Sequence, residues 1–188
     1  MHVTQLLLWI GIALTASSSV ELREISGRLL RPFMPEGKAN ILFFITSDCP
    51  ISNSYAPEIQ RICRDYEAKG VRCSLLYEDL SMDPAAARKH LQEYGYRDIA
   101  AAIDAERKVA AEAKAIVTPQ AVVVDAKGEI RYSGRINNFY AALGKSRLQV
   151  TANDLRDAVD AVLSGKPVAN PETQAVGCYI VPADPLSK

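Results

Sequence analysis

The chain has 188 residues, and 22 Lys and Arg balance 22 Asp and Glu, so its formal net charge is zero. This length predicts a single domain with a proper hydrophobic core, and the balanced charge argues against binding to nucleic acid or to an anionic membrane surface. Hydrophobic residues make up 48% of the chain, which argues against disorder over most of its length.

The N-terminal segment resembles a secretory signal. The apolar run LLLWIGIALTA (Leu6–Ala16) is followed by the small residues SSS, and it is shorter than the roughly 20 apolar residues that span a bilayer. The preceding residues contain no Lys or Arg, so a mis-chosen start codon or a first core strand stays open as an alternative. We expect residues 1–19 to be a signal peptide of an exported protein, periplasmic or otherwise extracytoplasmic. An uncleaved segment would anchor it to the membrane.

The first half of the domain reads as strand, helix, strand. One or two short strands are expected within residues 20–33, and the apolar run Asn40–Ile45 predicts a strand buried on both faces. A helix is predicted from Ser52 to Lys69, because its apolar residues recur at three- and four-residue spacing. Alternating apolar residues predict a second strand over Val71–Glu78.

The second half adds helices and a hairpin. A helix begins after Asp83 and ends at Gly95, an alanine-rich helix covers residues 106–115, and a final helix opens near Thr151 and stops at Gly165. An antiparallel hairpin, formed by residues 121–125 and 129–136, precedes that final helix.

This order of elements predicts the α/β class. A parallel βαβ unit followed by a hairpin and a covering helix indicates a three-layer sandwich around a central mixed sheet, over residues 20–165. Residues 166–188 form a proline-containing C-terminal tail that carries Cys178.

The chain has four cysteines but no CxxC motif, and only two histidines. No metal site of familiar Cys/His spacing is therefore expected. In an oxidising compartment four cysteines allow three fully paired connectivities. Cys63 and Cys73 occupy core positions of the predicted helix and strand, and a bridge between them stays open.

Cys49 is the candidate nucleophile, because it lies between a buried strand and the following helix. Backbone N–H groups and the positive end of a helix dipole favour a thiolate at such a junction. Ser52 could donate a hydrogen bond to the sulfur, and Thr46 could reach it from the other side, whereas the charge of Asp48 would oppose ionisation. We expect a lowered thiol pKa.

The stretch TSDCPISNSYAP resembles the thioredoxin-like superfamily, specifically the redoxin group that includes alkyl-hydroperoxide-reductase/thiol-specific-antioxidant (AhpC/TSA) proteins. Cys49 and Pro57 have the spacing of the family's first active cysteine and helix proline, and VTPQAVVVD matches its cis-proline loop. The resemblance implies a thioredoxin-like fold and a role in cell redox homeostasis, with neither organic cofactor nor metal. It also implies that Thr118 and Pro119 hold an extended substrate through backbone hydrogen bonds.

Two departures from the family pattern bear on function. Ser52 stands at the position of the second active cysteine, so CPIS (CxxS) replaces CxxC, and a monothiol cannot release itself from a mixed disulfide. Thr46–Pro50 fits the peroxiredoxin T-x-x-C-P signature, but Pro119 holds the position of the peroxiredoxin arginine. The 13 residues from Gly165 to Cys178 reach about 40 Å when extended, so the tail thiol has the length to meet Cys49.

The leading hypothesis is an exported thiol-disulfide oxidoreductase of thioredoxin fold. Cys49 would be its nucleophile, and Cys178 or an external thiol would resolve the intermediate. Its partners would be a protein disulfide or a peroxide as substrate and an external thiol as reductant. One alternative is a peroxiredoxin-like thiol peroxidase with an antioxidant role. Another is a non-catalytic thioredoxin-fold binding module, in which Cys49 is structural or ligates a metal with Cys178.

Overall fold

The computed structural model describes residues 20–181, so the predicted signal peptide, residues 1–19, lies outside the described residues, as do residues 182–188. The elements are β1 (Leu22–Arg23), β2 (Leu29–Leu30), β3 (Ala39–Ile45), α1 (Pro50–Ser54), α2 (Ala56–Glu67), β4 (Val71–Tyr77), α3 (Pro84–Glu93), β5 (Ala100–Ile103), α4 (Lys108–Ala113), β6 (Val117–Thr118), β7 (Gln120–Asp125), β8 (Ile130–Gly134), β9 (Tyr140–Ala142), β10 (Lys145–Ser146), α5 (Asp154–Leu163) and β11 (Cys178–Tyr179).

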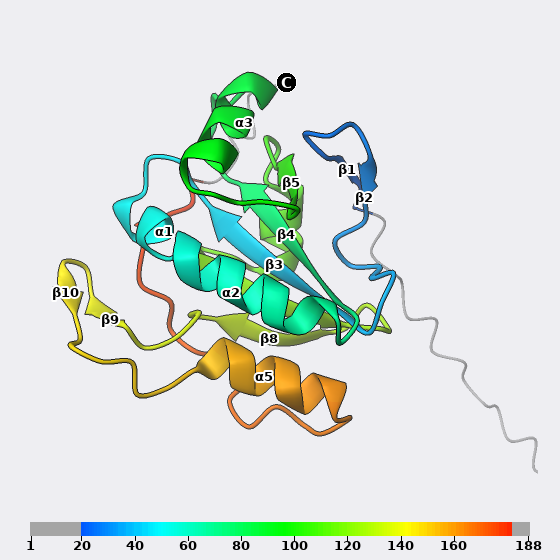
Figure 1. Cartoon of the computed structure of the whole chain (residues 1–188), viewed down its shortest axis with the longest axis vertical. Coiled ribbons are helices and arrows are strands. Elements are labelled where there is room, and N and C mark those ends of the chain that lie inside the picture. The colour runs from blue at the N-terminus through cyan, green and yellow to red at the C-terminus, as the bar shows by residue number, and fades with distance from the viewer. Residues whose placement is uncertain (1–19, 182–188) are drawn as a thin grey trace, which may run out of the picture.

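A mixed sheet of five strands forms the centre of the molecule, in the order β5-β4-β3-β7-β8 (Figure 1). Strands β3, β4 and β5 run parallel, whereas β7 is antiparallel to both β3 and β8. All seven residues of the central strand β3 are buried, as its apolar run predicts. The predicted α/β class and mixed sheet are confirmed.

Helices cover both faces of the sheet and complete the three-layer sandwich. Ile41 and Phe43 of β3 pack on one face with residues of α2 and α5, which Figure 1 shows in front of the sheet. Leu42 and Phe44 point to the opposite face, where they pack against residues of α4 and the N-terminal segment. Successive side chains of a strand point to opposite faces, so one apolar run supplies both cores.

The single helix predicted from Ser52 to Lys69 is two helices. α1 begins at Pro50, directly after Cys49, and ends at Ser54, and Tyr55 forms both its C-cap and the N-cap of α2. Pro57 lies in the first turn of α2, where its missing N–H costs no hydrogen bond within that helix. The chain can therefore restart a helix at this point, and the separate α1 places a helix N-terminus at the candidate nucleophile.

The tail returns across the molecule and covers the edge of the sheet. Ser133 N–H of edge strand β8 donates to Pro171 O at 2.9 Å, and Thr173 N–H donates to Ser133 O at 3.1 Å. Further on, β11 pairs antiparallel with β6, which directly precedes β7. Within residues 20–181, no helix has the length and apolar composition needed to cross a membrane.

Candidate active site

Cys49 caps the N-terminus of α1. It follows the loop after β3 and has extended backbone angles, φ −80° and ψ 111°, so its side chain turns back over the first turn of the helix. The Ser52 N–H donates to the Cys49 sulfur at 3.5 Å. The residue is buried, and the local sequence thus holds the thiol at the helix N-terminus that favours its ionised form.

Cys178 reaches Cys49 from the tail. Its thiol donates to the Cys49 sulfur across a distance of 2.8 Å, although 129 residues separate the two cysteines in the sequence. Both are free thiols in this structure. Cys178 lies opposite Thr118 in the β11–β6 pair, so a backbone interaction positions its sulfur.

The Thr118–Pro119 peptide bond is cis, and this loop forms the wall of the site beside both sulfurs. The Cys49 thiol donates to Thr118 O at 3.2 Å, and the Thr118 hydroxyl donates to Cys178 O at 3.5 Å. The Thr46 hydroxyl shares a 3.0 Å hydrogen bond with the Thr118 hydroxyl. The structure therefore brings together the predicted residues around a single pair of thiols.

The pKa values of the two thiols are shifted in opposite directions. Burial by itself raises the pKa of Cys49, but the donated thiol of Cys178, the Ser52 N–H and the Ser52 hydroxyl outweigh it and hold that pKa below the ordinary thiol value. Burial of the Cys178 sulfur raises the pKa of Cys178 to about 11, together with its hydrogen bond to Cys49 and the negative charges of Cys49 and Asp48. Cys49 therefore ionises first, with Cys178 holding the proton beside it.

The Ser52 hydroxyl stands where a second cysteine would stand in a CxxC motif. It is buried, and within residues 20–181 its oxygen has no partner in full hydrogen-bond geometry. A buried hydroxyl without a partner is costly, and the nearby Cys49 sulfur gains an acceptor's charge when it ionises. Ser52 can therefore stabilise the thiolate, although it cannot attack a disulfide.

A buried histidine supports α1 from behind. Asn53 donates to Ser47 O at 2.8 Å and contacts His90 Nε2 through its Oδ1 at 3.0 Å. On its other side His90 Nδ1 lies 2.8 Å from the Tyr77 hydroxyl. Burial lowers the pKa of His90 and so favours its neutral form, and its hydrogen bonds join the loop before Cys49 to α3. The sequence did not predict the contact between His90 and Asn53, because 37 residues separate them in the chain.

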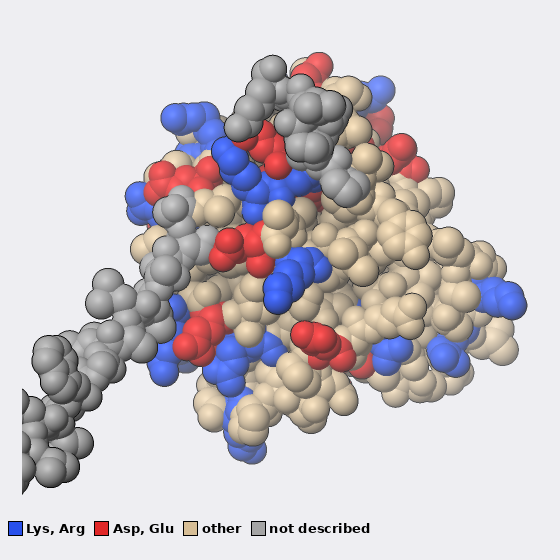
Figure 2. Space-filling view, turned by 180° about the vertical axis from the view of Figure 1, so that it is seen from behind, with Lys and Arg blue, Asp and Glu red and all other residues tan. Residues whose placement is uncertain are grey.

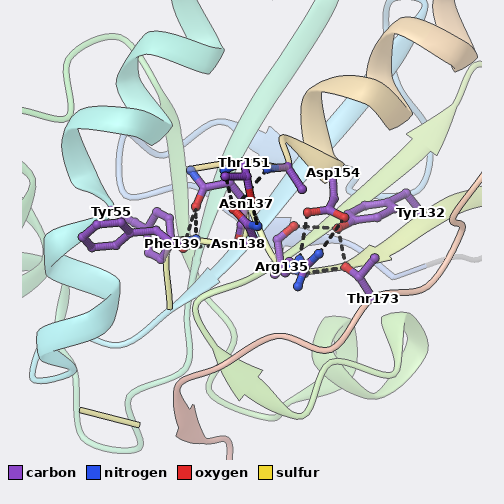
Figure 3. A network of polar contacts seen from close by, with 10 residues as sticks. Tyr55, Tyr132, Arg135, Asn137, Asn138, Phe139, Thr151, Asp154 and Thr173 are labelled. Carbon is purple, nitrogen blue, oxygen red and sulfur yellow. Dashed lines mark hydrogen bonds and ion pairs between the residues drawn. The ribbon is translucent and has the colours of Figure 1, made fainter. Parts of the chain in front are cut away.

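A second polar network anchors the tail before it reaches the site (Figure 3). Thr173 Oγ1 lies 2.6 Å from the Tyr132 hydroxyl and accepts from Arg135 N–H at 3.1 Å. Arg135 in turn makes a bidentate ion pair with Asp154 at the start of α5. Gly134 is required here, because a Cβ atom at that position would lie 2.1 Å from Thr173 Oγ1.

The same view shows how the loop after β8 is held against the start of α2. The Tyr55 hydroxyl donates to Asn137 Oδ1 at 2.9 Å, and Asn138 exchanges hydrogen bonds with Thr151. These contacts fix the segment that leads to the β9–β10 arm, which projects beside the active site at the left of Figure 1.

The other two cysteines lie away from the site. Cys63 of α2 and Cys73 of β4 are free thiols that line a separate cavity of about 320 Å³. Burial, together with the neighbouring Cys63, raises the pKa of Cys73, which disfavours the thiolate that attack on a substrate would need. In the part of the chain that the structure describes, no three His, Cys, Asp or Glu side chains gather as metal ligands.

Comparisons with known proteins identify the family and the fold of the chain. The model of the AhpC/TSA family matches residues 20–133, whereas comparison with curated proteins gave no match. An uncharacterized conserved protein from Geobacillus kaustophilus has a similar structure, with a TM-score of 0.78, 24% identity and 90% of each chain covered. A hypothetical protein from Sinorhizobium meliloti has a TM-score of 0.74 and 26% identity, over 87% of this chain and 91% of that one.

A more distant structural relative is a secreted Mycobacterium tuberculosis disulfide oxidoreductase homologous to DsbE of E. coli. Its TM-score is 0.52 and its identity is 18%, over 78% of this chain and 95% of that one. This likeness concerns the fold, which is thioredoxin-like. Because the family model covers more than half of the sequence, the chain belongs to the AhpC/TSA family.

Proposed function

We propose that this protein is an exported thiol-disulfide oxidoreductase in which Cys49 is the nucleophile and Cys178 resolves the mixed disulfide. The observation that carries the proposal is the 2.8 Å separation of the two sulfur atoms. Cys178 supplies from the tail the second thiol that the CPIS motif lacks, so a monothiol at the helix N-terminus becomes part of a dithiol.

The first step is attack by the Cys49 thiolate on one sulfur of a substrate disulfide. The substrate S–S bond breaks, a mixed disulfide forms at Cys49, and the leaving thiolate takes a proton from solvent. The lowered pKa of Cys49 supplies the nucleophile for this step. Neutral donors surround the sulfur, among them the Cys178 thiol and the Ser52 N–H.

In the second step the Cys178 sulfur, after losing its proton, attacks Cys49 Sγ. The bond between Cys49 and the substrate sulfur breaks, that sulfur leaves as a thiolate and takes up a proton, and the Cys49–Cys178 disulfide forms. The substrate has gained two electrons, and the protein has lost two, which an external thiol reductant returns by the same exchange chemistry. Run in reverse, the steps oxidise a substrate dithiol.

The proposal includes export of the protein. It rests on the apolar run that precedes residue 20. It also draws on the description of the Mycobacterium tuberculosis relative as a secreted disulfide oxidoreductase. A disulfide pair of this kind suits an oxidising compartment. Fractionation of cells that express the full chain, with N-terminal sequencing of the product, tests this part independently of the chemistry.

The test of the chemistry is peptide mapping without reduction, before and after equilibration with dithiothreitol. We expect a Cys49–Cys178 disulfide that opens on mild reduction and re-forms with a model disulfide substrate. Cys178→Ser should accumulate the mixed disulfide at Cys49, whereas Cys63→Ser serves as the matched control and should turn over normally. Rapid consumption of hydrogen peroxide by the reduced protein, without disulfide exchange, would instead identify the peroxidase alternative.

A further inference from the structure

We infer that the tail segment Gly177–Ile180 occupies the position that a substrate segment takes during exchange. Its sequence therefore indicates which substrates the site accepts. The inference rests on the proposed function and names its substrate class. That substrate is an extended protein segment with glycine immediately before the reacting cysteine, any residue after it and an apolar residue next. The segment takes the place of β11 at Cys49 during exchange.

Backbone contacts hold the tail at the edge of β6. Cys178 and Tyr179 lie opposite Thr118 and Val117 in antiparallel register, and Ile180 N–H donates to Ile116 O at 2.9 Å. Such hydrogen bonds do not depend on side chains, so β6 can pair with any extended chain that reaches it. An incoming segment in the same register would present its cysteine where Cys178 now lies.

Glycine before the cysteine is a steric requirement of this register. A Cβ atom at Gly177 would lie 2.0 Å from Thr118 O, 2.6 Å from Thr118 C and 3.1 Å from Pro119 N. These are backbone atoms of the cis-proline loop that leads into the central sheet, so they cannot move aside as a flexible side chain would. Any larger residue at this position would force the strand away from β6 and its cysteine away from Cys49.

The site places different requirements on the two positions that follow the cysteine. The Tyr179 side chain is 78% exposed, so the site makes little use of it. Ile180 instead packs against the core cluster formed by α4, β3 and β7. An apolar residue two positions after the cysteine therefore adds buried area, and a charged residue there would lose its solvation.

The tail can leave this strand position without unfolding the domain. Thr173 is fixed to Tyr132 and Arg135, four residues before Gly177. Residues 174–181 can separate from β6 while this anchor holds. Beyond the anchor, the contact with Arg107, which donates to Val181 O at 3.2 Å, has to break.

A groove beside the tail gives the incoming segment an approach. It has a volume of about 290 Å³ and lies between the β9–β10 arm and residues 174–179, with Val117, Tyr140 and Leu143 among its lining. Figure 2, seen from behind, shows mainly uncharged residues over the middle of this face, with Lys and Arg side chains toward the edge that carries the arm. Arg135 and Arg147 also line this groove, so it offers an approaching segment both apolar surface and positive charge.

In the exchange itself, the tail is reduced and detached, and a substrate segment that carries a disulfide pairs with β6. The Cys49 thiolate attacks the sulfur of the segment's cysteine, the substrate S–S bond breaks, a mixed disulfide forms at Cys49, and the other substrate cysteine leaves as a thiolate that takes a proton from solvent. The Cys178 thiol then loses its proton and attacks Cys49 Sγ, the bond between Cys49 and the substrate breaks, and the substrate sulfur leaves as a thiolate that takes up a proton. The substrate has gained two electrons and the protein has lost them.

The test uses the full-length Cys178→Ser chain with Cys49 converted to its mixed disulfide with 5-thio-2-nitrobenzoate. Release of that chromophore follows attack by reduced peptides, and mass spectrometry identifies the Cys49–peptide product. The parent peptide is AVGCYIV. Three variants replace the glycine by alanine, the tyrosine by alanine and the isoleucine by aspartate. Each rate is divided by the rate of the same peptide with the free aromatic disulfide, which removes differences in intrinsic thiol reactivity.

We expect the glycine peptide to react at least tenfold faster than the alanine peptide. The tyrosine replacement should change the rate less than twofold, and the aspartate peptide should be several-fold slower. Equal corrected rates for all four peptides would overturn the inference while leaving the oxidoreductase standing. Failure of Cys49 to exchange with any thiol, together with no Cys49–Cys178 disulfide in the wild-type chain, would overturn both.

Discussion

The sulfur atoms of Cys49 and Cys178 lie 2.8 Å apart, and the hydrogen bond between them runs from Cys178 to Cys49. This direction makes the two thiols unequal. Cys49 has a lowered pKa and Cys178 a raised one, about 11. The tail therefore has two effects on the nucleophile: it supplies the resolving thiol, and it stabilises the thiolate before reaction.

The acidity of Cys49 should therefore depend on the residue at position 178. Alkylation of the reduced protein by iodoacetamide, followed for the Cys49 peptide from pH 5 to 10, should give a midpoint below that of an ordinary thiol. Cys178→Ala removes the donor and should move the midpoint upward, whereas Cys178→Ser keeps a hydroxyl that can donate and should move it less. The same midpoint in all three proteins would contradict a role for the tail.

Gly177→Ala should weaken the thiol pair without harming the domain. The added Cβ atom meets the backbone of Thr118, so β11 must separate from β6. We expect the effective concentration of the Cys178 thiol at Cys49, measured by equilibrium with glutathione, to fall at least tenfold. Tyr179→Ala lies in the same strand but removes an exposed side chain, and it should stay within twofold of wild type. Equal losses in both variants would show that any change in the strand has this effect.

Thr173→Val should loosen the anchor of the tail. Its hydroxyl is the acceptor for Arg135 N–H and a partner of the Tyr132 hydroxyl, and the replacement leaves the Arg135 N–H unpaired. We expect a loss of about 1–2 kcal/mol in the free energy of unfolding of the reduced protein, measured by urea denaturation. The exposed neighbour Gln174, replaced by alanine, should change it by less than about 0.5 kcal/mol. A Thr173→Val protein as stable as wild type would contradict the anchoring role.

Sequence patterns predicted the parts of the fold whose apolar residues repeat within one element. The run Asn40–Ile45 and the alternation in Val71–Glu78 correspond to β3 and β4. β5 was not predicted, because Ala100–Ile103 is short and alanine-rich, and its strand form depends on pairing with β4. The same holds for β11, whose two residues become a strand only beside β6.

The candidate site was also predictable from the sequence only in part. The helix N-terminus at Cys49 and the cis-proline loop follow from local motifs, and the structure places both. The reach of the tail permitted contact between Cys178 and Cys49, but chain length alone could not choose this contact over others. The choice depends on Gly134 and Gly177, which let the tail approach two different backbone segments closely. Neither glycine is distinguishable from an ordinary turn glycine in the sequence.

The buried Glu78 makes the stability of the domain decrease as the pH rises. Its carboxylate is buried, and no atom within residues 20–181 is hydrogen-bonded to its oxygens, although Arg107 Nη1 lies 3.4 Å away. Burial and the nearby Asp104 raise the pKa of Glu78 to about 8. Between its ordinary pKa and pH 8 the folded state binds more protons than the unfolded state, so stability decreases across this window.

Glu78→Gln should therefore remove this dependence on pH, so that the stability of the variant relative to wild type rises by on the order of 1–3 kcal/mol between pH 5 and pH 8. Urea denaturation at several pH values measures it. Glu112→Gln changes an exposed carboxylate on α4 and serves as the control. A gain that is the same at pH 5 and pH 8 would show that ionisation of Glu78 is not its cause.

His90 should produce a slope of the opposite sign at lower pH. Burial lowers its pKa, with the nearby Asp79 and Glu93 acting in the other direction. Below the ordinary histidine value of about 6.5, the unfolded state binds a proton that the folded state does not. Stability is therefore complete above that pH and is lost as the pH falls through the window, by up to about 1.4 kcal/mol per pH unit.

Replacing His90 by glutamine should remove this slope, because the amide does not titrate. The measurement is the free energy of unfolding between pH 4.5 and 7.5, as the difference between the variant and wild type. Arg88→Gln alters an exposed residue of the same helix α3 and should leave the slope intact. Since Asn53 joins His90 to the loop before Cys49, the alkylation rate of Cys49 should change over the same window in wild type only. A slope that persists in His90→Gln would assign the acid sensitivity to another group.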